Sequence, residues 1–137
     1  MSTPAPSILS AFDDADWRAS QKLPYVFGGG HSSRFQPSGS PAGYDCSGWV
    51  STILHHAGIL GSSEALDTHA LERWGLAGRG EFMTVWTINV PGLEHTFIEF
   101  KVLGHLTKRW SAANHTGAIC GWVPWMDPAG YTARRRP

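Results

Sequence analysis

The sequence predicts an α+β fold in which N-terminal helices pack on a small antiparallel sheet. Apolar residues recur with helical spacing in the first half of the chain and with the period of two typical of strands in the second half. Helices followed by strands favour an antiparallel sheet over alternating parallel units. Of the 137 residues, 16% are charged, against roughly 25% in an average soluble domain. We therefore expect one folded domain rather than a disordered chain.

The first helix is expected to run from Ile8 to about Leu23. Its apolar residues keep a spacing near 3.6, and Pro24 ends it because the residue before a proline avoids the helical conformation. Residues 1–6 are predicted to be a flexible, Pro-rich leader. The stretch from 30 to 43, rich in Ser, Gly and Pro, is predicted to be a loop.

The second helix carries the strongest signals in the chain. Asp45 is a good N-cap residue, an apolar stripe runs from Trp49 to Ala57, and Gly58 can terminate the helix. We assign Trp49, which lies on this stripe, to packing. A shorter helix is predicted over Ala65–Trp74.

Strands are predicted in the second half, separated by Gly, Pro or Asn. They are expected at Phe82–Asn89, Leu93–Leu103, Leu106–Ser111 and Ala118–Val123. Residues 7–130 are then one domain. Residues 131–137 are interpreted as a basic tail, with Arg134 to Arg136 frayed.

Composition excludes several classes of protein. The 11 Lys and Arg balance the 11 Asp and Glu, so there is no basic stripe for a nucleic-acid partner. No apolar run approaches the ~20 residues of a membrane span, and the N-terminus lacks the features of a secretory signal. We expect a soluble product made in the cytoplasm. Two cysteines cannot form a disulfide framework.

Cys46 is the candidate nucleophile. A thiol in the first turn of a helix faces unpaired N–H groups and the positive end of the helix dipole, and both favour the reactive thiolate. The N–H groups of Cys46 and Ser47 could also stabilise an oxyanion. A small buried cysteine is the ordinary alternative, but the flanking Asp45 and Gly48 favour the functional interpretation. Cys120, inside a predicted strand, is assigned to packing.

His95 is the best candidate for the base that a cysteine nucleophile needs. It begins a strand after Pro91 and Gly92, and such a strand can lie against the nucleophile helix. His31 precedes Cys46 in a loop and could line a cleft, although a solvated loop residue is the simpler interpretation. The other histidines are assigned to packing or to the exposed surface: His55, His56, His69, His105 and His115.

No cofactor or metal is predicted. The spacings of His and Cys match no zinc motif. Gly28–Gly30 is not followed by the Lys and Ser or Thr of a phosphate loop. Its glycines are expected to give a ligand access to the backbone near Tyr25.

Three segments together resemble the NlpC/P60 family of cell-wall peptidases, most closely its actinobacterial and actinobacteriophage versions. They are Pro24–Gly30 (PYVFGGG), Tyr44–Val50 (YDCSGWV) and the strand that begins near His95. Residues 66–75 and 82–86 also resemble those versions, so the likeness spans about residues 12 to 123.

The resemblance implies a papain-like NlpC/P60 fold and hydrolysis of an amide bond in peptidoglycan stem peptides, often between D-glutamate and diaminopimelate. Cys46 would be the nucleophile and His95 the general base and acid. Tyr25 would line the site near the nucleophile. The remaining residues assigned to substrate binding are Gly29, His31, Asp45 and Ser47.

The third member of the family's site is a polar residue that orients the histidine. Alignment of the next strand puts Ser111 there. Serine is a weak substitute, so Asn114, His115 and Glu99 stay open as candidates for this role.

The missing signal and the cell-wall substrate together suggest a phage product. It would reach the wall through a holin, as an endolysin, or as part of a virion with other virion proteins as partners. A wall-binding or structural virion module that has lost turnover is the alternative, and Ser111 favours it. An amidase or acyltransferase on another substrate is a third possibility, because the same chemistry serves any acyl transfer.

Overall fold

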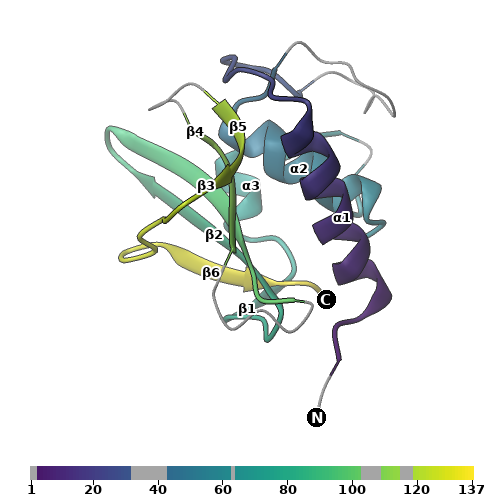
Figure 1. Ribbon diagram of the computed structural model, residues 1–137. Helices are drawn as coiled ribbons and strands as arrows, with labels where there is room; N and C mark the ends of the chain where they lie inside the picture. The colour runs from purple at the N-terminus through teal and green to yellow at the C-terminus, as the bar shows by residue number, and fades with distance from the viewer. Residues whose placement is uncertain (1–2, 32–42, 63, 103–108, 115–118) are drawn as a thin grey trace.

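The computed structural model describes residues 3–31, 43–62, 64–102, 109–114 and 119–137. It shows helices on one face of a six-stranded sheet in the order β1-β6-β2-β3-β4-β5, and every neighbouring pair is antiparallel (Figure 1). The α+β prediction is confirmed. The elements are α1 (Pro6–Ser20), α2 (Cys46–His56), α3 (Thr68–Leu71), β1 (Leu76–Ala77), β2 (Met83–Val90), β3 (Leu93–Phe100), β4 (Arg109–Asn114), β5 (Ile119–Val123) and β6 (Thr132–Arg135).

The helix α1 begins at Pro6, because proline is tolerated in the first turn, where its missing N–H has no helical partner. It ends at Ser20, three residues before the predicted end. Lys22 adopts a φ of 54°, a left-handed conformation that no α-helix can continue through.

The helix α2 follows its prediction closely. The Asp45 side chain accepts a hydrogen bond from the Gly48 N–H, as an N-cap residue should.

The helix α3 is shorter than predicted because the Leu66 backbone is hydrogen-bonded to α2. The Ser51 hydroxyl donates to the Leu66 carbonyl at 3.0 Å and accepts from its N–H at 2.9 Å, so the helix begins only after Asp67, which caps it.

The C-terminal residues correct the prediction of a basic tail. Thr132–Arg135 form β6, which lies between β1 and β2 in the sheet. The Arg134 guanidinium donates to the carbonyls of Trp74, Arg73 and Gly75. Arg134 thus binds the turn after α3. The sequence shows only a run of basic residues and does not reveal this role.

The predicted strands are present with shifted ends. The strand β3 ends at Phe100 rather than Leu103. The strand β4 continues to Asn114, three residues beyond its predicted end, and its predicted start at Leu106 lies outside the described residues. Residues 103–108 and 115–118 lie outside the described part of the chain, as do residues 1–2 of the leader and most of the predicted loop, residues 32–42.

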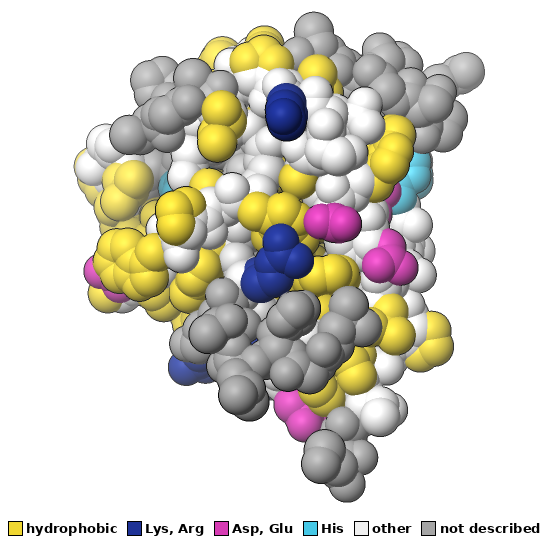
Figure 2. Space-filling view, in the orientation of Figure 1, with side chains coloured by type: hydrophobic (Ala, Val, Ile, Leu, Met, Phe, Trp, Pro, Cys, Tyr) yellow, Lys and Arg dark blue, Asp and Glu magenta, His cyan; other side chains and the backbone are white. Residues whose placement is uncertain are grey.

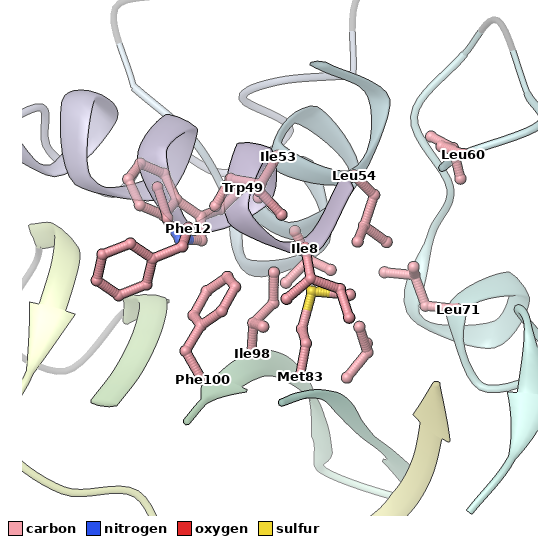
Figure 3. Packing of buried hydrophobic residues seen from close by; sticks show 14 of the residues in the cluster. Ile8, Phe12, Trp49, Ile53, Leu54, Leu60, Leu71, Met83, Ile98 and Phe100 are labelled. Atoms are coloured by element: carbon pink, nitrogen blue, oxygen red, sulfur yellow. The ribbon is translucent and has the colours of Figure 1, made fainter. Parts of the chain in front are cut away.

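Two apolar cores lie on the two faces of the sheet. The larger one joins α1 and α2 to β2 and β3, with Phe12, Trp49, Ile53, Ile98 and Phe100 among its side chains (Figure 3). Trp49 and Cys120 are buried, which confirms their assignment to packing. The smaller core, on the other face, contains Trp86, Phe97, Trp110 and Ala112.

Charged side chains are scattered over the face shown in Figure 2, among hydrophobic and uncharged ones. Within the described residues, the model contains no helix that is both long enough and apolar enough to span a membrane.

One charged side chain is buried in the larger core region and joins α1 to the start of α2. Arg18 is only 2% exposed. Its guanidinium pairs with Asp14 at 2.7 Å and donates to the Tyr44 hydroxyl at 2.9 Å. Tyr44 stands two residues before Cys46, so this link fixes the segment that leads into α2.

We predict strong coupling between Arg18 and Tyr44. Tyr44→Phe leaves a buried guanidinium donor without its acceptor, which should lower the free energy of unfolding by about 1–3 kcal/mol. The double variant Arg18→Met/Tyr44→Phe should lose less than the sum of the two single variants. Urea unfolding of all four proteins tests this, and strictly additive losses would contradict it.

Candidate active site

A cleft of about 570 Å³ is lined by the side chains that can act as nucleophile, base or hydrogen-bond partner. Tyr25 comes from the segment after α1, Cys46 begins α2, His95 lies on β3 and Asn114 ends β4. The rest of the lining is Gly92 of the β2–β3 turn, Leu93 and Glu94 at the start of β3, and Met126. The two residues predicted as nucleophile and base therefore share one cavity, although 49 positions separate them in sequence.

The cleft opens where β3 and β4 diverge. The two strands pair from Phe100 and Arg109 to Ile98 and Ser111. The first residues of β3, from Leu93, and the last residues of β4, up to Asn114, lie beyond this paired stretch. Thr96 lies beyond the end of this ladder, and its N–H donates to the Cys46 sulfur. The Cys46 sulfur thus accepts a hydrogen bond from the strand that carries His95.

Burial keeps the Cys46 thiol protonated. Burial raises the pKa of Cys46 most, and the neighbouring Asp45 carboxylate raises it further. Hydrogen bonds from the N–H groups of Thr96, Ser47 and Cys46 lower the pKa, but they do not offset the first two effects. The backbone donors predicted to favour a thiolate are thus present, and in the free protein burial and Asp45 outweigh them.

His95 is neutral for a similar reason. Burial lowers its pKa below the ordinary 6.5, because the charged imidazolium is poorly solvated there, and a hydrogen bond with Asn114 partly opposes this. The ring of His95 packs near those of Phe97 and Tyr131, with centroid distances of 6.0 and 6.5 Å. A neutral imidazole can accept a proton, so His95 is in the form that a general base requires.

Asn114, and not Ser111, contacts His95. Extending the register from Ile98 and Ser111 places Asn114 opposite His95. Ser111, three residues earlier, faces the other side of the sheet, where its Oγ accepts a 2.9 Å hydrogen bond from the Trp49 indole. This geometry contradicts the assignment of Ser111 as the orienting residue. Because the predicted β4 ended at Ser111, its continuation to Asn114 was missed.

Glu99 lies too far from His95 to orient its ring. It is four residues along β3 from His95, about 13 Å at the usual strand rise, and its carboxylate lies 3.6 Å from the Arg79 guanidinium. His115, the remaining candidate for the orienting role, lies outside the described residues.

Asp45, His31 and Ser47 form a compact network beside Cys46. His31 Nε2 lies 2.8 Å from Asp45 Oδ1 and 2.9 Å from Ser47 Oγ. The hydrogen bond with Asp45 raises the pKa of His31. Burial alone would raise the pKa of Asp45, but hydrogen bonds from His31 and from the N–H groups of Gly48 and Gly28 lower it overall.

Of the residues predicted to bind substrate, only Tyr25 is found among the described lining of the cleft. Burial raises its pKa, so its hydroxyl remains a hydrogen-bond donor. Gly29 packs too closely on Gly43 for a side chain to fit, because a Cβ at Gly29 would lie 2.4 Å from the Gly43 carbonyl oxygen. His31, Asp45 and Ser47 support the start of α2.

Sequence reasoning missed two residues at the site, Met126 and Tyr131. The Asn114 amide donates to the Met126 sulfur at 3.6 Å, which leaves its oxygen for His95. Burial raises the pKa of Tyr131, and the nearby Cys46 raises it further. Both lie in an irregular segment without periodicity, so no sequence pattern could have identified them.

The remaining described histidines lie elsewhere. The rings of His55 and His56 meet edge to face at the end of α2, with centroids 5.1 Å apart. His69 contacts Glu94. His105 and His115 are outside the described residues. Within the described chain, no group of three or more His, Cys, Asp or Glu could hold a metal ion.

Comparison of the chain with models of protein families and with curated proteins finds no match.

We predict different effects for the two polar residues of β4. Asn114→Ala removes the hydrogen bond that raises the pKa of His95, so this pKa should fall further below 6.5. Ser111→Ala should leave the His95 pKa unchanged but cost about 1–3 kcal/mol of stability, because the buried Trp49 N–H loses its acceptor. An NMR titration of the His95 ring, with urea unfolding, tests both. A shift of the His95 pKa in Ser111→Ala alone would contradict the geometry.

Asp45→Asn should abolish the upward shift of the His31 pKa. In the native protein His31 titrates above 6.5, so the pair stabilises the fold fully below pH 6.5 and loses this contribution as pH rises through the His31 pKa. Without the carboxylate, burial should leave that pKa at or below 6.5. Asp67→Asn, at the N-cap of α3, is the matched control and should change the NMR titration of His31 only slightly. An unaltered His31 titration in Asp45→Asn would refute the pairing.

Proposed function

We propose that this protein is a cysteine peptidase that hydrolyses an amide bond in peptidoglycan stem peptides. The observation that carries the proposal is the cleft in which Cys46, His95 and Asn114 meet. A nucleophile, a neutral base and a residue that orients the base are the groups that thiol-dependent acyl transfer requires.

The proposed reaction follows from the resting protonation states. As the Cys46 sulfur attacks the carbonyl carbon, His95 takes the thiol proton and the carbonyl oxygen becomes an oxyanion. The N–H groups of Cys46 and Ser47, which lower the pKa of the thiol, are the donors proposed to bind that oxyanion. The C–N bond then breaks, and the leaving amine takes the proton from His95.

The second half of the reaction restores the enzyme. A water molecule gives a proton to His95 and attacks the thioester carbon. The C–S bond then breaks, the carboxylic acid leaves, and the sulfur recovers its proton from His95. Asn114, by accepting a hydrogen bond from the ring, holds the imidazole in one orientation through both halves.

The choice of substrate rests on the resemblance of Pro24–Gly30, Tyr44–Val50 and the His95 strand to the NlpC/P60 family. We accordingly propose a papain-like NlpC/P60 fold, with the bond between D-glutamate and diaminopimelate as one candidate target. The same likeness, which is closest to actinobacterial and actinobacteriophage versions, supports a phage-encoded enzyme that acts at the bacterial wall, as an endolysin or within a virion.

A second function is a wall-binding or structural virion module without turnover. The observation that favours it is electrostatic. Burial raises the pKa of Cys46 and lowers that of His95, so the pair rests neutral and no thiolate is preformed. Such a module would bind purified cell wall without releasing new amino termini.

Release of new amino termini from purified cell wall tests the proposal. Cys46→Ala and His95→Ala should each reduce release at least on the order of 1,000-fold, since nucleophile and base act as a unit. Cys120→Ala is the matched control, because the second cysteine is buried and lies outside the cleft lining. Equal release of amino termini by wild type and Cys46→Ala would contradict the proposal. Binding of the wild type to cell wall without release of amino termini would favour the wall-binding module.

A further inference from the structure

The glycine segment before His31 packs directly on the first turn of α2. A Cβ at Gly30 would lie 2.9 Å from the Gly48 Cα, so the two backbones are in close contact. The Asp45 N–H donates to the Gly29 carbonyl at 3.1 Å. His31, which follows this segment, is thereby held against the residues at the start of α2.

The contacts of His31 determine where its protons lie. Its Nε2 is 2.8 Å from Asp45 Oδ1 and 2.9 Å from Ser47 Oγ. An ionised carboxylate only accepts hydrogen bonds, so Nε2 carries a hydrogen toward Asp45. The proton that makes the ring cationic is then taken up at Nδ1. The His31 side chain is 25% exposed, so the ring can exchange this proton with water.

The Asp45 carboxylate acts on both His31 and Cys46. The hydrogen bond with Asp45 raises the pKa of His31 most, burial lowers it, and the charges of Asp45 and Asp67 raise it further. Burial raises the pKa of Cys46, and the Asp45 charge raises it further. A proton on His31 adds a positive charge beside that carboxylate, which offsets the effect of the carboxylate on Cys46.

Other titratable side chains around Asp45 and Cys46 stay uncharged near neutral pH, because burial raises the pKa of each. They are Tyr25, Tyr131 and Cys120, whose pKa is raised to about 11. His95 lines the cleft with Cys46, and burial lowers its pKa below 6.5. Among the described groups beside Asp45 and Cys46, His31 is thus the one that loses a charge as pH rises above 6.5.

We infer that His31 is a positioning residue whose charged form offsets the Asp45 carboxylate and thereby favours the Cys46 thiolate. As pH rises through the His31 pKa, the ring becomes neutral, the carboxylate is no longer offset, and Cys46 becomes harder to deprotonate. Because the thiolate is the nucleophilic form, the charged ring assists attack in mildly acidic solution. In assigning this effect to catalysis, the inference rests on the proposed function.

Alkylation of Cys46 by iodoacetamide tests the inference, because its rate follows the thiolate fraction and needs no turnover. The variant is His31→Gln, whose amide can still donate to Asp45 but carries no charge. At pH 6.0 its Cys46 should react about two- to ten-fold more slowly than in the wild type, which corresponds to a pKa rise of up to about one unit. At pH 9.0, where His31 is neutral, the two rates should agree.

His69→Gln is the matched control, because His69 is exposed and contacts Glu94 instead of Asp45. Its Cys46 should react as in the wild type at both pH values. Mass spectrometry of proteolytic fragments assigns the alkylation to each cysteine. Cys120 is buried, so its alkylation in a variant would reveal unfolding.

The wild type provides a second measurement that does not depend on the folding of a variant. A plot of the logarithm of the Cys46 alkylation rate against pH should become shallower across the His31 pKa, which NMR titration locates. This bend lies above pH 6.5, whereas any contribution of His95 lies below it.

Three results would overturn the inference. They are a straight plot across the His31 pKa, an equal loss of rate at both pH values in His31→Gln, and the same pH-dependent loss in His69→Gln. The predicted alkylation pattern without release of amino termini from cell wall by the wild type would count against the proposed function alone. Release by the wild type without the predicted pattern would refute the role of His31 and leave the proposed function intact.

Discussion

The Asp45 carboxylate is the interaction on which the candidate site depends. It caps α2 through the Gly48 N–H at 2.7 Å, accepts from the Gly28 N–H at 3.2 Å, and pairs with His31 at 2.8 Å. The Asp45 N–H donates in turn to the Gly29 carbonyl. One side chain thus fixes both the first turn of α2, which carries Cys46, and the glycine segment that follows Tyr25.

The same carboxylate has an electrostatic cost for the chemistry. Burial raises the pKa of Cys46 and the negative charge of Asp45 raises it further, so the residue that positions Cys46 also disfavours its thiolate. In the proposed mechanism the thiol loses its proton only during attack, when His95 accepts it and the backbone donors can bind the developing oxyanion. Burial of His95 suits this role, because it keeps the imidazole neutral before the reaction.

Features set by local signals were predictable from sequence. The start of α2 after Asp45 and the choice of Cys46 and His95 as candidate site residues follow from a cap, an apolar stripe and a strand pattern, all encoded within short segments. The residue that contacts His95 could not be identified from sequence, because it depends on strand register. The strand β4 extends three residues further than predicted. Asn114 therefore faces His95, whereas Ser111 faces Trp49. The basic run in β6 was misinterpreted because its partners are carbonyls about 60 positions away.

The central claim is that Cys46 forms a covalent acyl intermediate with the help of His95. Acid quenching of the protein during turnover of cell-wall peptides, followed by mass spectrometry of its proteolytic fragments, tests this claim most directly. The account predicts a peptidyl adduct on the fragment that contains Cys46, none on the fragment with Cys120, and none in His95→Ala. Release of products with no adduct on Cys46 at any quench time, together with undiminished release by Cys46→Ala, would contradict it.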